Sequence, residues 1–424
     1  MSRSIPDSLK AVLVVCDGLG DHPIPSLRGK TPLEAAQTPT LDQLAAEGAT
    51  GLIHVIAPGI PPGSDTGHLA LLGYDSSSCY TGRGPFEALG AGMRLHPTDI
   101  AFRGNFATVQ CTTGQGCRVL DRRAGRRVPE GAKLVKLIDG LSLPSSPDIE
   151  VVVKHTVEHR CAVVLRGRNL SRQISDTDPH EQSLDVQESK PLDTSEAAQY
   201  TASLVNELTR AFYRILSASP LNAERRQAGL PEANIVLLRG AGTLPEIPSL
   251  HDLYGIRAAC VAGGALYKGV ARSVGMDILS VRGATARYDT DEVAKATAAA
   301  KTLSKHDFVF LHFKPADSAA HDKNPQKKIE MIEKLDHLLS TLQKHVDKDN
   351  TFIALTADHS TSSLNGQHTG DPVPLLINGP RVRHDHVTQF SERACANGGL
   401  GHLVGKDLMP ILMNYISRTP KYGA

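Results

Sequence analysis

The sequence predicts an α/β protein with a mostly parallel sheet, helices on both faces of that sheet, and a smaller inserted α+β domain. Three short apolar runs, 11–16, 308–313 and 351–356, have the length and composition of strands buried on both faces. Segments with helical spacing separate the later runs, and this alternation is typical of a parallel sheet covered by helices.

A change in character divides the chain, and 424 residues are enough for two domains. From about residue 98 to 232, short strand-like runs alternate with basic turns, and a helical pattern covers 194–217. Strand–helix alternation then resumes with the apolar run 233–242. We therefore expect a discontinuous metal-binding domain of residues 1–95 and 234–424. The inserted substrate-binding domain would be residues 96–233, hinged near residues 95 and 233.

The composition excludes several classes of function. A net charge of +1 attracts neither nucleic acid nor an anionic membrane, and the chain has no Trp and only 4% aromatic residues for base stacking. No apolar stretch approaches the roughly 20 residues that a membrane span needs. Seven cysteines without a CxxC pair predict reduced thiols and a cytoplasmic protein. The sequence does not indicate an oligomeric state.

Metal-ligand side chains lie at or just past the ends of the apolar runs, where open α/β sheets bind their ligands. The candidate ligands are Asp17, Ser64, Asp317, His321, Asp358, His359 and His368. A single Asp after a strand is more often a loop residue or a helix cap, but this set shares one type of position. Mixed carboxylate and imidazole ligands suit Mn²⁺ or Zn²⁺, with Mg²⁺ and Co²⁺ as alternatives.

Ser64 is the candidate nucleophile of this site. Coordination to a metal ion would lower the pKa of its hydroxyl, and two ions a few ångströms apart can stabilise both the attacking and the leaving oxygen in phosphoryl transfer. Ser64 also precedes a helix-like stretch, and the N-terminus of a helix favours a phosphate.

Several segments resemble the alkaline phosphatase superfamily: VVCDGLGD, GSDTGHLALLGYD, KPADSAAHD, LTADHST and HTGDPVP. FRGNFATV, LLRGAG and GGALYKGVARSVGMD are more specific, and with them nearly the whole chain resembles the archaeal type of 2,3-bisphosphoglycerate-independent phosphoglycerate mutase. The resemblance implies one metal centre made by Asp17, Ser64, Asp358 and His359. The second centre would be made by the other three ligands.

The resemblance also implies a reaction. It would interconvert 3-phosphoglycerate and 2-phosphoglycerate in glycolysis and gluconeogenesis, through a phosphoserine at Ser64. The inserted domain would supply a lid and the arginines that bind the substrate, namely Arg103, Arg122, Arg123, Arg126, Arg127 and Arg160. Asp178 and His180 would handle protons at the glycerate hydroxyls. Lys268 would neutralise the transferring phosphoryl group or protonate the leaving oxygen.

Three alternative functions remain open at the level of the sequence. A homoserine-kinase-like phosphotransferase would need a nucleoside triphosphate, and the glycine-rich stretch 82–92 matches no nucleotide-binding loop. A phosphohydrolase would use the same metals and serine but would admit water to the phosphoserine. A metal-stabilised binding protein would have no need for a nucleophilic serine.

Overall fold

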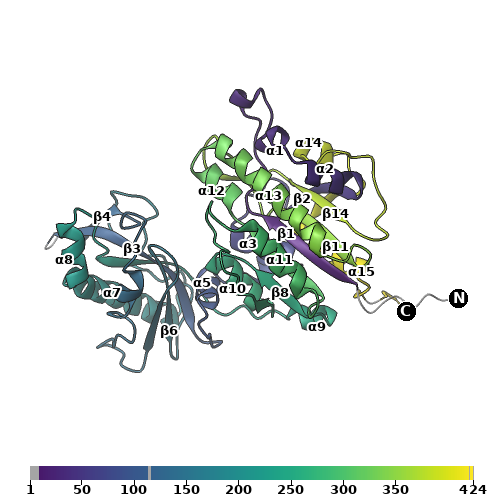
Figure 1. Cartoon of the computed structure of the whole chain (residues 1–424). Helices are drawn as coiled ribbons and strands as arrows, with labels where there is room; N and C mark the ends of the chain where they lie inside the picture. Colours follow the sequence, from purple (N-terminus) through teal and green to yellow (C-terminus); the bar gives the residue numbers. More distant parts are fainter. Residues whose placement is uncertain (1–8, 113–115, 420, 424) are drawn as a thin grey trace. The chain divides into compact units, whose positions relative to one another are not determined.

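A computed structural model describes residues 9–112, 116–419 and 421–423. The chain folds into two compact units: Met1–Cys79 with Ile247–Ala424, and Tyr80–Glu246 (Figure 1). We refer to them as the first and the second unit. No helix among the described residues has the length and apolar character needed to cross a membrane.

The first unit contains an eight-stranded, mostly parallel sheet, as predicted. From edge to edge its strands are β15 (Gly401–Val404), β2 (Ala49–His54), β14 (Val373–Asn378), β11 (Thr351–Thr356), β1 (Lys10–Cys16), β10 (Phe308–Phe313), β8 (Ala258–Val261) and β9 (Asp277–Ile278). Only β14 runs antiparallel to its neighbours. Every residue of β10 and β11 is buried, which explains why these strands read as continuous apolar runs.

Helices cover this sheet. Those that contact its strands include α2 (Pro39–Ala46), α10 (Ala265–Ser273), α11 (Glu292–Thr302) and α15 (Leu408–Tyr415). The long helix α13 (Pro325–His345) packs against α11 and α2 (Figure 1). Shorter elements complete the unit: α1 (Pro32–Ala35), α3 (Ser64–Leu71), α4 (Ser76–Cys79), α9 (Leu250–Tyr254), α12 (Pro315–His321), α14 (Glu392–Cys395), the 3₁₀ helices Pro25–Leu27 and Gly405–Asp407, and the pair β12 (Ser360–Thr361) and β13 (His368–Thr369).

The second unit contains an antiparallel sheet in the order β4 (Gly116–Asp121), β3 (Ile100–Thr112), β6 (Arg160–Arg166) and β5 (Glu150–His155). The strand β7 (Ile235–Gly242) also pairs with β3. Helix α7 (Glu196–Ser217) packs on β7, and its first turn is capped by the Ser195 side chain. The remaining helices are α5 (Gly84–Gly90), α6 (Gly131–Val135) and α8 (Pro220–Gln227).

The apolar run 233–242 does not resume the parallel sheet, so that prediction is wrong. It forms β7, which is antiparallel to β3 in the second unit. A buried apolar run reads alike in either sheet, and only its partner strand decides where it belongs. Helix α5 likewise packs on β3, β6 and β7. The second unit therefore begins at Tyr80 and ends at Glu246, beyond the boundaries expected near 95 and 233.

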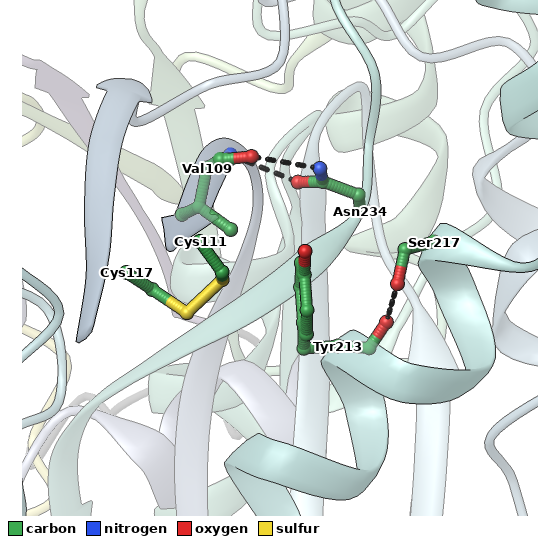
Figure 2. Close-up of a disulfide and its surroundings, with 6 residues drawn as sticks. All are labelled: Val109, Cys111, Cys117, Tyr213, Ser217 and Asn234. Carbon is green, nitrogen blue, oxygen red and sulfur yellow. Dashed lines mark hydrogen bonds between the residues drawn. A yellow bond between two sulfur atoms is a disulfide. The ribbon is translucent and has the colours of Figure 1, made fainter. Parts of the chain in front are cut away.

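The prediction that all thiols are reduced is also wrong. Cys111 on β3 and Cys117 on β4 face each other across the hairpin and form a disulfide (Figure 2). Nearby, the Asn234 side chain both accepts a hydrogen bond from the backbone N–H of Val109 and donates one to its carbonyl. A spacing of six residues does not reveal a hairpin by itself. The other five cysteines are free.

Candidate active site

All seven candidate ligands lie in the first unit, and its strands explain their positions. Asp17 directly follows β1, and Asp358 and His359 follow β11. Asp317 and His321 lie one turn apart on α12, just after β10. Ser64 is the first residue of α3, and His368 begins β13. Because β1, β10 and β11 are parallel neighbours, their carboxyl ends bring these groups to one sheet edge.

One cluster consists of Asp317, His321 and His368. The His321 Nε2 atom lies 3.3 Å from Asp317 Oδ1 and 3.3 Å from His368 Nε2, and the distance from His368 Nε2 to Asp317 Oδ1 is 3.7 Å. The Nδ1 atoms of both rings bond to backbone carbonyls, that of Gly366 at 2.7 Å and that of Pro62 at 2.8 Å. Because a carbonyl only accepts, each Nδ1 must carry the proton.

The second cluster is centred on His359. Its Nε2 atom lies 3.2 Å from Ser64 Oγ, 3.2 Å from Asp358 Oδ2 and 3.6 Å from Asp17 Oδ1. Its Nδ1 atom lies 2.9 Å from Thr361 Oγ1, and the Thr361 hydroxyl donates to Asp317 Oδ1 at 3.0 Å. Since that hydroxyl proton is used on Asp317, His359 Nδ1–H is the donor to Thr361. The Nε2 atom faces Ser64 and the two carboxylates. Burial lowers the pKa of His359, but Asp358 and Asp17 raise it overall.

These arrangements fit divalent metal ions. The Nε2 atoms of His321, His359 and His368 are directed at one another or at carboxylate oxygens, so a divalent ion bound there would be shared by ligands of both types. Their separations agree with the roughly 3.3 Å expected between two ligands of a tetrahedral ion with bonds of about 2.0–2.1 Å. In addition, Asp358 Oδ2 is buried and has no hydrogen-bond partner among the described residues. Fixing the proton on Nδ1 is how proteins orient ligand histidines.

The three buried carboxylates are ready to bind cations. Burial alone raises the pKa of Asp17, but the Lys314 ammonium and the His312 hydrogen bond hold it well below its usual value. Burial also raises the pKa of Asp317, and Lys314 again lowers it overall. The pKa of Asp358 is lowered too, against the effects of burial and Asp17, because His359 and His68 are close. All three are therefore ionised at neutral pH.

A glycine and the first turn of a helix shape the backbone around the candidate ligands. Gly18 follows Asp17 with a φ of 63° and donates its N–H to Asp358 Oδ1 at 3.1 Å. A Cβ at this position would lie 2.8 Å from the Cβ of Asp317, so only glycine fits. Ser64, only 6% exposed, lies in the first turn of α3, where the free N–H groups of a helix favour an anion.

The second unit contains a separate, cationic cluster. Arg103 on β3 pairs in register with Arg239 on β7, and Arg160 lies on the other neighbouring strand, β6. Burial and then Arg160 and Arg83 lower the pKa of Arg103 well below its usual value. Burial, with Arg83 as the next cause, lowers the pKa of Arg239 to about 10. Buried arginines that also repel one another are typical of sites that bind anions.

Two carboxylates accompany these arginines. Glu87 lies 3.5 Å from Nη1 of Arg103 and 3.5 Å from Nε of Arg83. Asp178 accepts two hydrogen bonds from Arg122, at 2.8 and 2.7 Å, in a bidentate pair. Five guanidinium groups thus surround two carboxylates, which leaves an excess of positive charge. The Nε atoms of Arg103 and Arg239 are buried without a hydrogen-bond partner in the part of the chain that the structure describes.

The other predicted substrate-binding residues lie elsewhere in the second unit. The side chains of Arg123, Arg126 and Arg127 are exposed, and Arg126 contacts Glu158 at 3.8 Å. His180 is also exposed, and its ring lies 3.0 Å from Asp176. The structure thus brings Arg103, Arg122 and Arg160 into the cluster but leaves these four at the surface.

Lys268 lies on α10 in the first unit, next to Tyr267. The lysine that touches the candidate ligands is Lys314, which contacts Asp17 Oδ1 at 3.1 Å and also Asp317 Oδ2. Four residues of these clusters were not identified from the sequence, namely Lys314, His312, Thr361 and Arg239. Lys314 and His312 alternate at the end of a strand, which places them on one face and could have revealed them.

Two family models match the chain. One is described as 2,3-bisphosphoglycerate-independent phosphoglycerate mutase and covers residues 45–222. The other is described as type I phosphodiesterase / nucleotide pyrophosphatase and covers residues 241–385. Together with the sheet and the strand-end ligands, they define an enzyme of the alkaline phosphatase superfamily, whose members use divalent metal ions.

Relatives that match over the full length narrow this class. A 2,3-bisphosphoglycerate-independent phosphoglycerate mutase of Ignicoccus hospitalis is 49% identical over 98% of this chain and 99% of its own. A homologue of the same name from Methanocaldococcus jannaschii is 46% identical over the same shares. The chain belongs to the family of 2,3-bisphosphoglycerate-independent phosphoglycerate mutases.

Solved structures agree with this assignment. A protein of Pyrococcus horikoshii is 39% identical, with a TM-score of 0.85 over 98% of this chain and all of that chain. The cofactor-independent phosphoglycerate mutase of Thermoplasma acidophilum is 36% identical, with a TM-score of 0.68 over 96% of this chain and 100% of that chain.

Proposed function

We propose that this protein interconverts 3-phosphoglycerate and 2-phosphoglycerate through a phosphoserine at Ser64, without 2,3-bisphosphoglycerate. The observation that carries the proposal is the position of the Ser64 hydroxyl. It lies 3.2 Å from the ligand His359, at the start of a helix, in a chain whose full-length relatives bear the name of this mutase. No observation favours a homoserine-kinase-like enzyme or a phosphohydrolase.

The reaction needs two transfers at one serine. Ser64 Oγ forms a bond to phosphorus as the bond from phosphorus to the 3-oxygen of the glycerate breaks, and the serine proton leaves while the 3-oxygen gains one. The glycerate then turns, and its 2-oxygen takes the phosphoryl group from Ser64. Two divalent ions, when bound, would supply charge neutralisation for both transfers and activation of the serine.

We assign the metal ligands as the two clusters suggest. Asp17, Ser64, Asp358 and His359 would hold one ion, and Asp317, His321 and His368 the other. Manganese is the proposed best activator, because imidazole and carboxylate ligands occur together. Chelation followed by addition of single metals tests this choice. Full activity in the metal-free protein would refute the metal requirement, and a better response to another ion would refute manganese.

The arginine cluster of the second unit is the proposed binding site for the phosphate and carboxylate of the substrate. The planar guanidinium group binds both in bidentate fashion, and the cluster already has more cations than anions. The exposed Arg123 and Arg126 are proposed as secondary contacts. Asp178 and His180 remain the proposed proton-handling groups, and Lys268 is proposed to neutralise charge at the phosphoryl group.

The cytoplasm, where its phosphoglycerate substrates are metabolised, is the proposed location.

A coupled enolase assay with 3-phosphoglycerate, and with no added 2,3-bisphosphoglycerate, tests the function. We expect sustained formation of phosphoenolpyruvate by the wild type and none by Ser64→Ala. Release of inorganic phosphate as the main product would establish a phosphohydrolase instead. Consumption of ATP with homoserine, without isomerisation, would establish the kinase-like alternative.

A further inference from the structure

Two residues at the end of β10 hold the two oxygens of Asp17. The His312 Nε2 atom lies 3.1 Å from Asp17 Oδ2, and the Lys314 Nζ atom lies 3.1 Å from Asp17 Oδ1. Alternate residues of an extended chain point to the same side, so one strand end delivers both groups. Lys314 additionally contacts Asp317, but His312 has Asp17 as its side-chain partner.

His312 is buried among aromatic rings and beside a second histidine, His68, whose ring centroid lies 5.0 Å away. The His312 side chain is 1% exposed, and the ring stacks on Tyr267 with centroids 3.6 Å apart and planes 21° apart. The Phe310 ring is tilted by 50° against the His312 ring, with centroids 6.1 Å apart. Among the described residues His312 Nδ1 is buried without a hydrogen-bond partner. Because the Asp17 carboxylate only accepts hydrogen bonds, the His312 Nε2 atom is the donor of this pair and carries the proton.

A core role does not explain a histidine at this position. A buried nitrogen without a partner is destabilising, and a phenylalanine would fill the same space beside Tyr267 without that cost. What the histidine adds is one directed N–H bond to a carboxylate. Such bonds fix the orientation of metal-ligating carboxylates, and their loss typically reduces metal affinity about 10–100-fold.

We propose that His312 is a positioning residue that orients Asp17 for metal binding through its Nε2–H. The proposal rests on the proposed function in one respect, the assignment of Asp17 as a metal ligand. His312 suits the test better than Lys314, because Lys314 is a cation that also contacts Asp317, whereas His312 has Asp17 as its side-chain partner.

Calorimetric titration of Mn²⁺ into chelated protein, without substrate, tests the proposal. His312→Phe keeps the stacking and removes the N–H, and we expect Mn²⁺ affinity to fall about 10–100-fold. His312→Gln keeps an N–H donor, and we expect it to restore affinity to within about threefold of the wild type. Tyr267→Phe keeps the ring beneath His312 and serves as the matched control with unchanged affinity. Thermal unfolding should show His312→Phe at least as stable as the wild type, since the unpaired nitrogen is gone.

Two outcomes would overturn the proposal. Unchanged Mn²⁺ affinity in His312→Phe would show that Asp17 needs no such support. Equal losses in the Phe and Gln variants, with reduced stability in both, would show a packing role. The proposed function fails separately: a wild type that binds Mn²⁺ but does not isomerise phosphoglycerates refutes the mutase and leaves the role of His312 intact.

Discussion

Replacing Arg239 with methionine should make the protein more stable and less active at the same time. Arg239 is a largely buried cation, and besides burial the charges of Arg83 and Arg122 lower its pKa, against the opposing effect of Asp178. Methionine has a similar length and no charge, so it keeps much of the packing. A gain in stability from the loss of a polar residue is the signature of a group retained for binding rather than for folding.

The magnitude follows from the pKa. Burial, with Arg83 as the next cause, lowers the pKa of Arg239 from 12.5 to about 10. At about 1.4 kcal/mol per unit, holding the charged form costs up to about 3.5 kcal/mol. Because the folded pKa is below the unfolded one, this cost is complete below pH 10 and disappears only as the pH rises through 10 toward 12.5. At pH 7–8 we therefore expect Arg239→Met to raise the free energy of unfolding by about 1–3 kcal/mol.

Urea unfolding in phosphate-free buffer measures the stability, and the coupled enolase assay measures the KM for 3-phosphoglycerate. Loss of a charge-assisted contact of about 1.5–3 kcal/mol should raise KM roughly 10–150-fold. Arg210→Met is the matched control, because Arg210 lies on α7 of the same unit, is exposed and pairs with the exposed Glu188 at 2.8 Å. A variant at Arg239 that loses stability while keeping its KM would refute the reasoning, since Arg239 would then be a structural residue.

Three further predictions concern the serine, the second layer of the metal site and the disulfide. Ser64→Ala should fold and bind metal yet form no phosphoprotein, whereas mass spectrometry of wild type quenched with substrate should find phosphate on Ser64; phosphate elsewhere would contradict the covalent route. Thr361→Val removes the acceptor of His359 Nδ1–H, and leaving that buried donor without a partner costs about 1–3 kcal/mol. Calorimetry should therefore show weaker Mn²⁺ binding by Thr361→Val, whereas Thr361→Ser should retain the affinity. Replacing Cys111 and Cys117 by serine should lower the free energy of unfolding by about 2 kcal/mol, as expected for a short loop, without changing Mn²⁺ affinity; a count of seven free thiols in the denatured, unreduced protein would show that the bond is absent.

Local patterns predicted the first unit well. Strands such as β1, β10 and β11 are continuous apolar runs, because they are buried on both faces. Each is followed within a few residues by a candidate ligand, since the chain leaves a parallel sheet at the edge where ligands bind. The approximate positions of these groups therefore followed from sequence order alone.

The features that the sequence did not reveal depend on pairing between distant segments. Arg103 and Arg239 are opposed because β3 pairs with β7, and nothing local to either strand indicates that register. The same pairing moves β7 out of the parallel sheet and shifts the unit boundary. The disulfide depends on a hairpin that opposes Cys111 and Cys117. In the sequence Thr361 is one threonine among many, and only the structure shows that its hydroxyl joins His359 to Asp317 through two hydrogen bonds.

The two units have opposite electrostatic deficits. In the first, buried carboxylates such as Asp358 lie together beside imidazole Nε2 atoms, an arrangement that suits cations. In the second, guanidinium groups such as Arg239 outnumber their carboxylates, so this unit requires an anion. Neither deficit is useful for folding, because unpaired buried polar groups reduce stability. A phosphorylated acid that is bound together with divalent metal ions satisfies both units, because the metals supply the cations and the substrate supplies the anion. The chemistry of the described residues therefore favours phosphoryl transfer over a binding protein, which would need only one of the two sites.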